Sequence, residues 1–177
     1  MVFTFPILII LAILFFSMSK EIKKDSNPKF FFLHLLSIVT LYVSAVSFIT
    51  MIFQVINIYF PDAMQGDIYY RSENTYQILR SAISFLLVMF PVYIGTLFTL
   101  DKVYLKDKKT RDSAVRKWLI YLTLFVGALT VLFTLVSVFN TFLDGELTTR
   151  FFLKVLTILF VAGGVLSYYG HDLKKFK

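Results

Sequence analysis

Residues 118–142 read WLIYLTLFVGALTVLFTLVSVFNTF, a run without a single charged side chain. As an α-helix this run would be about 38 Å long at roughly 1.5 Å per residue, enough to cross a hydrocarbon core of about 30 Å. Arg116 and Lys117 precede the run, and a segment containing charged residues, 143–150, follows it. The segment therefore predicts a transmembrane helix.

The same pattern recurs along the rest of the chain. Hydrophobic residues make up 58% of the 177 residues, and charged residues make up only 16%, against about 25% in ordinary soluble domains. We therefore predict an all-α, multi-pass transmembrane helical bundle. Its four core helices form the domain 28–177, and residues 1–27 supply an N-terminal membrane helix and a basic linker. The other apolar segments are 2–18, 30–60, 76–100 and 151–170.

Two of these segments depart from the usual length of a membrane helix. Residues 2–18 would span about 25 Å, slightly less than the hydrocarbon core. This segment lacks the basic start and the cleavage site of a secretory signal, so we expect it to be retained. Residues 30–60 would span about 46 Å, so this helix must tilt, kink or project beyond the core before Pro61 ends it.

The positions of lysine and arginine orient the predicted helices, because cytoplasmic loops of membrane proteins carry an excess of both. Fourteen of the eighteen basic residues fall in three groups, at 20–29, 102–117 and 174–177. Five crossings place all three groups on one side. We therefore predict that the N-terminus lies outside and the C-terminus in the cytoplasm. The remaining four basic residues are Arg71, Arg80, Arg150 and Lys154.

Residues that usually carry catalysis or hold cofactors are scarce. The chain has no cysteine, no HExxH or GxSxG motif and no phosphate-binding glycine loop. The only histidines, His34 and His171, both fall on the predicted cytoplasmic side. Two facing histidines can bind haem between helices, but nothing else in the sequence supports that arrangement. We expect no enzyme activity, no cofactor and no metal site.

Several polar residues lie toward the predicted outer ends of the helices, and two interpretations of them stay open. In the first, the charged side chains extend to the headgroup level, which costs little near a helix end. In the second, the group lines an outward-facing polar pocket for an anionic headgroup, a small anion or a partner's acidic side chain. The residues are Gln54, Asn57, Arg80, Asn140, Glu146, Arg150 and Lys154.

Small residues inside the spans indicate how the helices pack, because helices in lipid associate through close contact and hydrogen bonds. In the segment 30–60, Thr40, Ser44 and Ser47 share one side. Gly127 allows close approach in the segment 118–142, and Gly163 with Ser167 forms a small-xxx-small pair in the segment 151–170. Pro91 removes a backbone donor from the segment 76–100, so we expect a bend there.

Four stretches carry a resemblance to a known family. They are RKWLIYLTLFVGAL at 116–129, GELTTRFFLKVLTILFVAGGVLSYY at 145–169, FPVY at 90–93 and YVSAVS at 42–47. Together they resemble domain of unknown function 5671, a bacterial family of four-helix membrane domains. The resemblance covers about residues 28–175. It implies a multi-pass bacterial membrane domain and brings no activity, ligand or catalytic residue. We expect that membrane to be the bacterial plasma membrane.

The pattern as a whole favours an interaction or accessory subunit that uses its packing faces and the basic segment 102–117. The alternative is a small channel, transporter or ligand-binding protein that uses the outward-facing polar pocket. The formal net charge of +7 sits mainly in short loops beside the membrane, so we expect lipid contact rather than nucleic-acid binding. A homo-oligomer or a membrane protein partner fits the first function.

Overall fold

A computed structural model of the chain describes residues 28–60, 68–106, 114–145 and 148–174. These residues form four α-helices, and the expected N-terminal helix at 2–18 lies outside them. Each of the four helices is long and apolar enough to cross a membrane. The helices are α2 (Pro28–Tyr59), α3 (Ile68–Lys106), α5 (Ala114–Leu143) and α6 (Thr149–Lys174).

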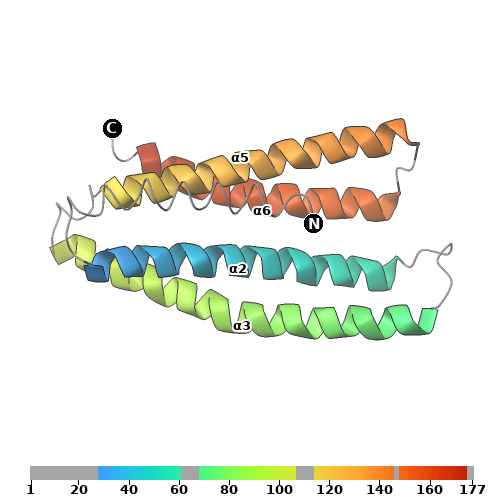
Figure 1. Cartoon of the computed structure of the whole chain (residues 1–177), viewed down its shortest axis with the longest axis horizontal. Coiled ribbons are helices and arrows are strands. Elements are labelled where there is room, and N and C mark those ends of the chain that lie inside the picture. Colours follow the sequence, from blue (N-terminus) through green and yellow to red (C-terminus); the bar gives the residue numbers. More distant parts are fainter. Residues whose placement is uncertain (1–27, 61–67, 107–113, 146–147, 175–177) are drawn as a thin grey trace.

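The four helices alternate in direction along a common long axis (Figure 1). The start of α2, the end of α3, the start of α5 and the end of α6 therefore gather at one end of the bundle. We call this the cavity end, because the four helices line a cavity there. The described members of the basic groups identified above, such as Lys29, Lys102 and Lys117, all belong to the cavity end.

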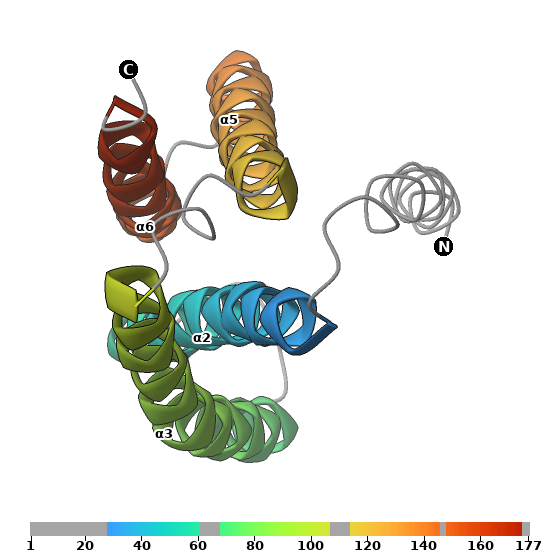
Figure 2. The same cartoon turned by 90° about the vertical axis from the view of Figure 1, so that its left-hand side faces the viewer.

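The helices pack as two pairs. The most extensive contacts join α2 to α3 and α5 to α6, and α2 links the pairs by touching both α6 and α5. Figure 2 shows α5 and α6 on one side and α2 and α3 on the other, with the last turns of α3 reaching toward α6. The cavity end is consequently the part of the bundle to which all four helices contribute.

Helix α3 is longer than its apolar segment predicts. It covers 39 residues, about 58 Å at roughly 1.5 Å per residue, whereas the predicted span runs only from 76 to 100. Pro91 lies inside the helix and cannot donate the backbone hydrogen bond to the carbonyl of Leu87. Figures 1 and 2 show α3 curved along its length, as the proline predicts.

Small polar residues form the buried face of α2. Ser37, Thr40, Ser44 and Ser47 recur every three or four residues and are all buried. The Thr40 hydroxyl donates to the carbonyl of Leu36 at 2.7 Å, within its own helix. Such local bonds let a small polar side chain be buried without a partner on another helix. Thr40, Ser44 and Ser47 are thus buried on the packed side of α2, as predicted, and the Ser44 hydroxyl has no hydrogen-bond partner among the described residues.

Gly127 marks the closest approach of α5 to α6. A methyl group added at Gly127 would lie 2.9 Å from Cδ2 of Leu166, so α6 occupies the space that a side chain would need. Gly163 and Gly164 differ, since a methyl group added at either meets no atom within 4 Å in the part of the chain that the structure describes. The predicted packing role of Gly163 is therefore wrong in the described bundle, because the described neighbouring helices leave open space beside it.

Large apolar side chains cover the outside of the bundle. Phe160 is 75% exposed, and Phe133, Phe139 and Phe152 also point outward. The buried positions, in contrast, include many serines and threonines. A bundle in water would bury its phenylalanines and expose its polar residues, whereas a bundle in lipid gains nothing from that arrangement. This distribution is the one expected for helices that face hydrocarbon.

Candidate functional site

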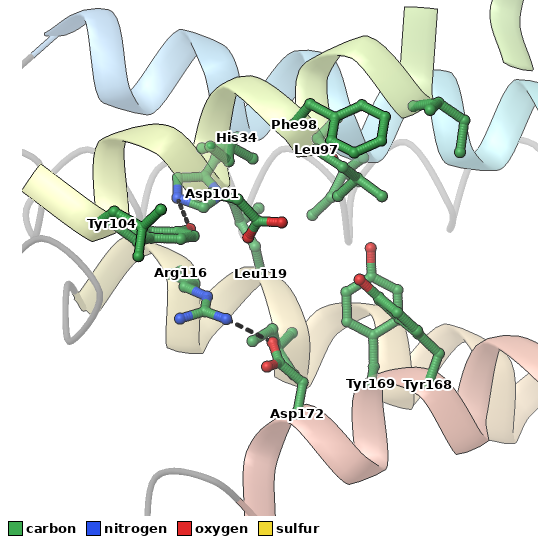
Figure 3. Close-up of a pocket in the computed structure, with 16 residues that line it drawn as sticks. His34, Leu97, Phe98, Asp101, Tyr104, Arg116, Leu119, Tyr168, Tyr169 and Asp172 are labelled. Carbon is green, nitrogen blue, oxygen red and sulfur yellow. Dashed lines mark hydrogen bonds and ion pairs between the residues drawn. The ribbon is translucent and has the colours of Figure 1, made fainter. Parts of the chain in front are cut away.

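A cavity of about 990 Å³ lies at the cavity end of the bundle, and every one of the four helices lines it. His34 and Ser37 come from α2, and Arg116 comes from the first turn of α5. Helix α3 supplies a wall from Ile94 to Leu105, and α6 supplies Tyr168, Tyr169 and Asp172. Figure 3 shows these side chains converging on one space.

A chain of polar contacts crosses the cavity end from helix to helix. A hydrogen bond of 2.9 Å joins the Tyr104 hydroxyl on α3 to Nε2 of His34 on α2. The guanidinium of Arg116 lies over the Tyr104 ring, 4.6 Å from its centroid. Nη2 of Arg116 also donates to Oδ2 of Asp172 on α6 at 2.7 Å. Because each of the four helices supplies one member, these contacts hold the helix ends around the cavity.

The ion pair between Arg116 and Asp172 is largely shielded from solvent. The two side chains are 10% and 23% exposed. Charges removed from water in this way need a close partner, because each would otherwise carry an uncompensated desolvation cost. Asp172 therefore neutralises most of the charge that Arg116 brings into the cavity wall.

Apolar side chains form the deeper wall of the cavity. The wall includes Ile38 from α2, Leu97 from α3, and Leu119 and Ile120 from α5. Leu119 and Ile120 are themselves buried, so the wall is held firmly by the surrounding helices. The cavity thus combines an apolar wall with polar and charged side chains, and small-molecule sites also combine the two kinds of lining.

Three further polar side chains border the same space. Tyr168 and Tyr169 pack edge to face, with ring centroids 5.0 Å apart, and Figure 3 shows both hydroxyls directed toward the cavity. The Asp101 carboxylate enters from α3 (Figure 3). Unlike Asp172, Asp101 has no ion pair or hydrogen bond with any residue in the described helices.

Sequence reasoning did not identify this site. In the sequence, Arg116 is one residue of the basic segment 102–117, and no local pattern marks Tyr168 and Tyr169 as site residues. The contacts join residues far apart in the chain, 70 positions for His34 and Tyr104 and 56 for Arg116 and Asp172. A usable signal was present, because Asp101 and Asp172 are acids at the ends of spans where basic residues otherwise dominate.

The two histidines take different places. His34 lines the cavity and bonds to Tyr104, whereas His171 is exposed on α6 and is not part of the cavity lining. In the described ranges of the chain, no group of three or more histidine, aspartate or glutamate side chains is arranged to hold a metal ion. His34 instead serves the polar contacts between α2 and α3.

At the opposite end of the bundle, part of the predicted outer group comes together between α2 and α6. The Asn57 carbonyl oxygen accepts from Arg150 twice, from Nη2 at 2.6 Å and from Nε at 3.0 Å. The Asn57 amide donates to Oε1 of Gln54 at 3.0 Å. Nζ of Lys154 lies 5.5 Å from the centre of the Phe53 ring. These contacts fasten α6 to the end of α2.

The other members of the predicted outer group lie elsewhere. Arg80 on α3 and Asn140 on α5 are both exposed, on helices outside the α2–α6 contact. Glu146 lies outside the described residues. The structure thus gathers Gln54, Asn57, Arg150 and Lys154 and leaves Arg80 and Asn140 on the outer surface of the bundle.

Comparison with known families matches the chain to the model of domain of unknown function 5671 over residues 31–169. The chain belongs to this family. The resemblance inferred from the sequence is therefore confirmed. No curated protein and no solved structure gives a significant match. The domain of unknown function 5671 includes most of the cavity lining, from His34 on α2 to Tyr169 on α6, and Asp172 follows shortly after the matched residues.

Proposed function

We propose that the chain is a multi-pass membrane protein that binds an amphiphilic ligand in the cavity between its four helices. The observation that carries this proposal is the cavity itself, with its apolar wall and its charged residues at one end. Each helix contributes to it, so binding would engage the whole bundle. This is the ligand-binding class of the sequence-based alternatives, located at the opposite end from the pocket predicted there.

The dimensions of the cavity suit a headgroup with part of an acyl chain. Along α3 the lining extends from Ile94 to Leu105, about 16 Å at roughly 1.5 Å per residue. The charged residues Asp101, Arg116 and Asp172 all lie within a few residues of the ends of the apolar spans. A headgroup at that level and a tail beside Leu97 would each meet groups of matching polarity.

The orientation predicted from the basic residues belongs to this proposal. Lysines and arginines at the cavity end favour a cytoplasmic position for it, with the chain in a bacterial plasma membrane. Under the five-span arrangement the N-terminus is outside and the C-terminus is in the cytoplasm. The ligand would then enter from the inner leaflet or from the cytoplasm.

Filling the cavity tests the proposal. Leu97 lines the cavity on α3, and Leu132 on α5 is exposed and outside its lining. We expect native mass spectrometry of the full chain, purified from membranes in mild detergent, to detect a retained amphiphile. Leu97→Trp should remove most of it, whereas the matched Leu132→Trp should retain it. Equal retention by both variants, or no retained amphiphile in the unmodified chain, would contradict the proposal.

An interaction or accessory subunit is a second candidate. Helix α3 continues beyond its apolar segment to Lys106, and α5 begins at Ala114. Lys102 and Lys117 thus lie on extensions of these helices, where a partner could contact them; residues 107–113 lie outside the described residues. The same purification tests this candidate, because a stable partner or homo-oligomer would remain bound and appear in the mass spectrum.

A further inference from the structure

We infer that the cavity selects an amphiphile with a positively charged ammonium headgroup and that Asp101 is the counter-ion of that group. This inference rests on the proposed function and names the class of ligand. It depends on the balance of charge among Asp101, Arg116 and Asp172, and on the two tyrosines that border the same space.

The charged residues of the cavity leave one carboxylate uncompensated. Arg116 and Asp172 neutralise each other across 2.7 Å. Asp101 lines the cavity without an ion pair among the described residues. Lys102 is its neighbour in sequence, but consecutive residues of a helix point about 100° apart, and Lys102 is not part of the lining. Asp101 is exposed at the cavity, so its carboxylate is available to a cation that enters there.

An anionic headgroup fits the same cavity poorly. The Arg116 guanidinium already donates to Asp172 and stacks on Tyr104. An anion would have to compete with Asp172 for the Arg116 guanidinium and would approach the Asp101 carboxylate as well. Unfavourable contacts of this kind discriminate between ligands as effectively as attractive ones. The Asp101 carboxylate, which has no partner among the described residues, thus gives the site a preference for a cation even though the chain as a whole carries a net charge of +7.

The tyrosines of α6 complete an environment suited to an ammonium group. Tyr168 is 54% exposed, and Figure 3 shows its hydroxyl bordering the space that the Asp101 carboxylate enters. Tyr169 is buried, its hydroxyl shares a hydrogen bond with Tyr93 on α3, and its ring packs edge to face against that of Tyr168. A hydroxyl oxygen accepts hydrogen bonds from an ammonium group, and a tyrosine ring attracts a cation over its face. Groups from α3 and α6 would therefore surround the headgroup, with the apolar wall around the tail.

The ammonium group could come from an aminophospholipid headgroup or from a free lipophilic amine. A phospholipid also brings a phosphate, whereas a free amine brings only the cation and its hydrocarbon chain. Both present the same charge to Asp101. The experiment therefore uses one arm for each source.

The first arm measures binding of dodecylamine and of dodecyl phosphate to the full chain in mild detergent. Trp118, the only tryptophan of the chain, packs against Leu119 of the cavity wall and reports binding through its fluorescence. We expect at least tenfold tighter binding of dodecylamine than of dodecyl phosphate. Asp101→Asn should weaken dodecylamine binding about fivefold, the upper range for a solvent-accessible ion pair. Asp101→Glu should retain most of it.

Asp144→Asn is the matched control. Asp144 is an exposed acid that follows α5 at the opposite end of the bundle. It changes the net charge of the chain as Asp101→Asn does, so it should leave dodecylamine binding unchanged. Equal binding of dodecyl phosphate and dodecylamine, or equal effects of Asp101→Asn and Asp144→Asn, would overturn the inference.

The second arm identifies the source. The full chain is placed in bilayer discs with equal amounts of phosphatidylethanolamine and phosphatidylglycerol, and retained lipid is measured after extraction. Selective retention of phosphatidylethanolamine that Asp101→Asn abolishes supports a lipid headgroup. Dodecylamine binding without that selectivity supports a free amine, and selective retention of phosphatidylglycerol overturns the inference. If Leu97→Trp abolishes retention of the amphiphile and Asp101→Asn has no effect, the proposed function is supported. Only the inferred preference for a cation is then contradicted.

Discussion

At the scale of single residues, tertiary contacts decide the environment and the partners of the Arg116 charge. In the sequence it is one of seven basic residues between 102 and 117. In the structure it is only 9% exposed, paired with Asp172 and stacked on Tyr104. Its burial is possible because α6 brings an acid to it from 56 positions away. No local pattern around Arg116 contains that information.

A double-mutant cycle measures the coupling free energy between Arg116 and Asp172. Arg116→Leu should lower the free energy of unfolding in micelles by about 1–3 kcal/mol, the cost of leaving a buried acceptor unsatisfied, because the Asp172 carboxylate is partly buried and loses its partner. Asp172→Leu should have a similar effect for the converse reason. The double variant should recover part of the loss, since neither charge is then buried alone. The measurement is reversible unfolding followed by circular dichroism.

Strict additivity of the two single losses would contradict this account. It would mean that Arg116 and Asp172 contribute independently, Arg116 through the Tyr104 ring and Asp172 through solvent contact. A coupling free energy of at least about 1 kcal/mol is expected for charges in direct contact.

At the scale of the helices, sequence patterns predicted the element types and most of their extents. The four apolar segments from 30 onward correspond to α2, α3, α5 and α6. The largest difference is in α3, which extends beyond its apolar segment at both ends. Hydropathy locates the part of a helix that crosses lipid, whereas backbone hydrogen bonding continues into water wherever no proline or glycine stops it. Helix length is therefore underestimated from hydropathy alone.

Close approach between helices provides a prediction at this scale. Gly127→Leu should lower the free energy of unfolding by about 1–3 kcal/mol, the usual cost of overpacking, because Leu166 fills the adjacent space. The better helix propensity of leucine offsets about 0.8 kcal/mol of that cost. Thermal unfolding in micelles, followed by circular dichroism, measures the difference.

Gly163→Leu is the control for this substitution. No described atom lies within 4 Å of a methyl group built at Gly163, so the variant should be as stable as the unmodified chain or slightly more stable. If Gly127→Leu and Gly163→Leu have the same effect, α5 and α6 do not approach each other closely at Gly127.

At the scale of the whole molecule, cysteine labelling tests the predicted orientation in the membrane. The chain has no cysteine, so a single introduced cysteine is the only site that a maleimide can label. Single cysteines at Lys102→Cys and Asp144→Cys place one label site at each end of the bundle. In intact cells, a membrane-impermeant maleimide should modify the cysteine at 144. It should reach the cysteine at 102 only after permeabilisation, because the basic groups favour the cytoplasm.

The reverse pattern would invert the orientation and direct the cavity toward the outside. Labelling of both cysteines in intact cells would contradict a membrane crossing between them. The amphiphile-binding proposal is independent of this result, since it depends on the cavity and not on the side that the cavity faces.

The amino-acid sequence by itself determined that the described chain forms four long apolar helices with basic residues concentrated at one end. Hydropathy and charge are local properties, so they can be read from each segment of the sequence without knowing which helices pack beside it. Only the tertiary structure decided that His34, Tyr104, Arg116 and Asp172 meet and that Asp101 enters a shared cavity. Those contacts depend on the rotation of each helix about its axis. In lipid, small differences in packing between neighbouring helices set that rotation, because hydrophobic burial does not.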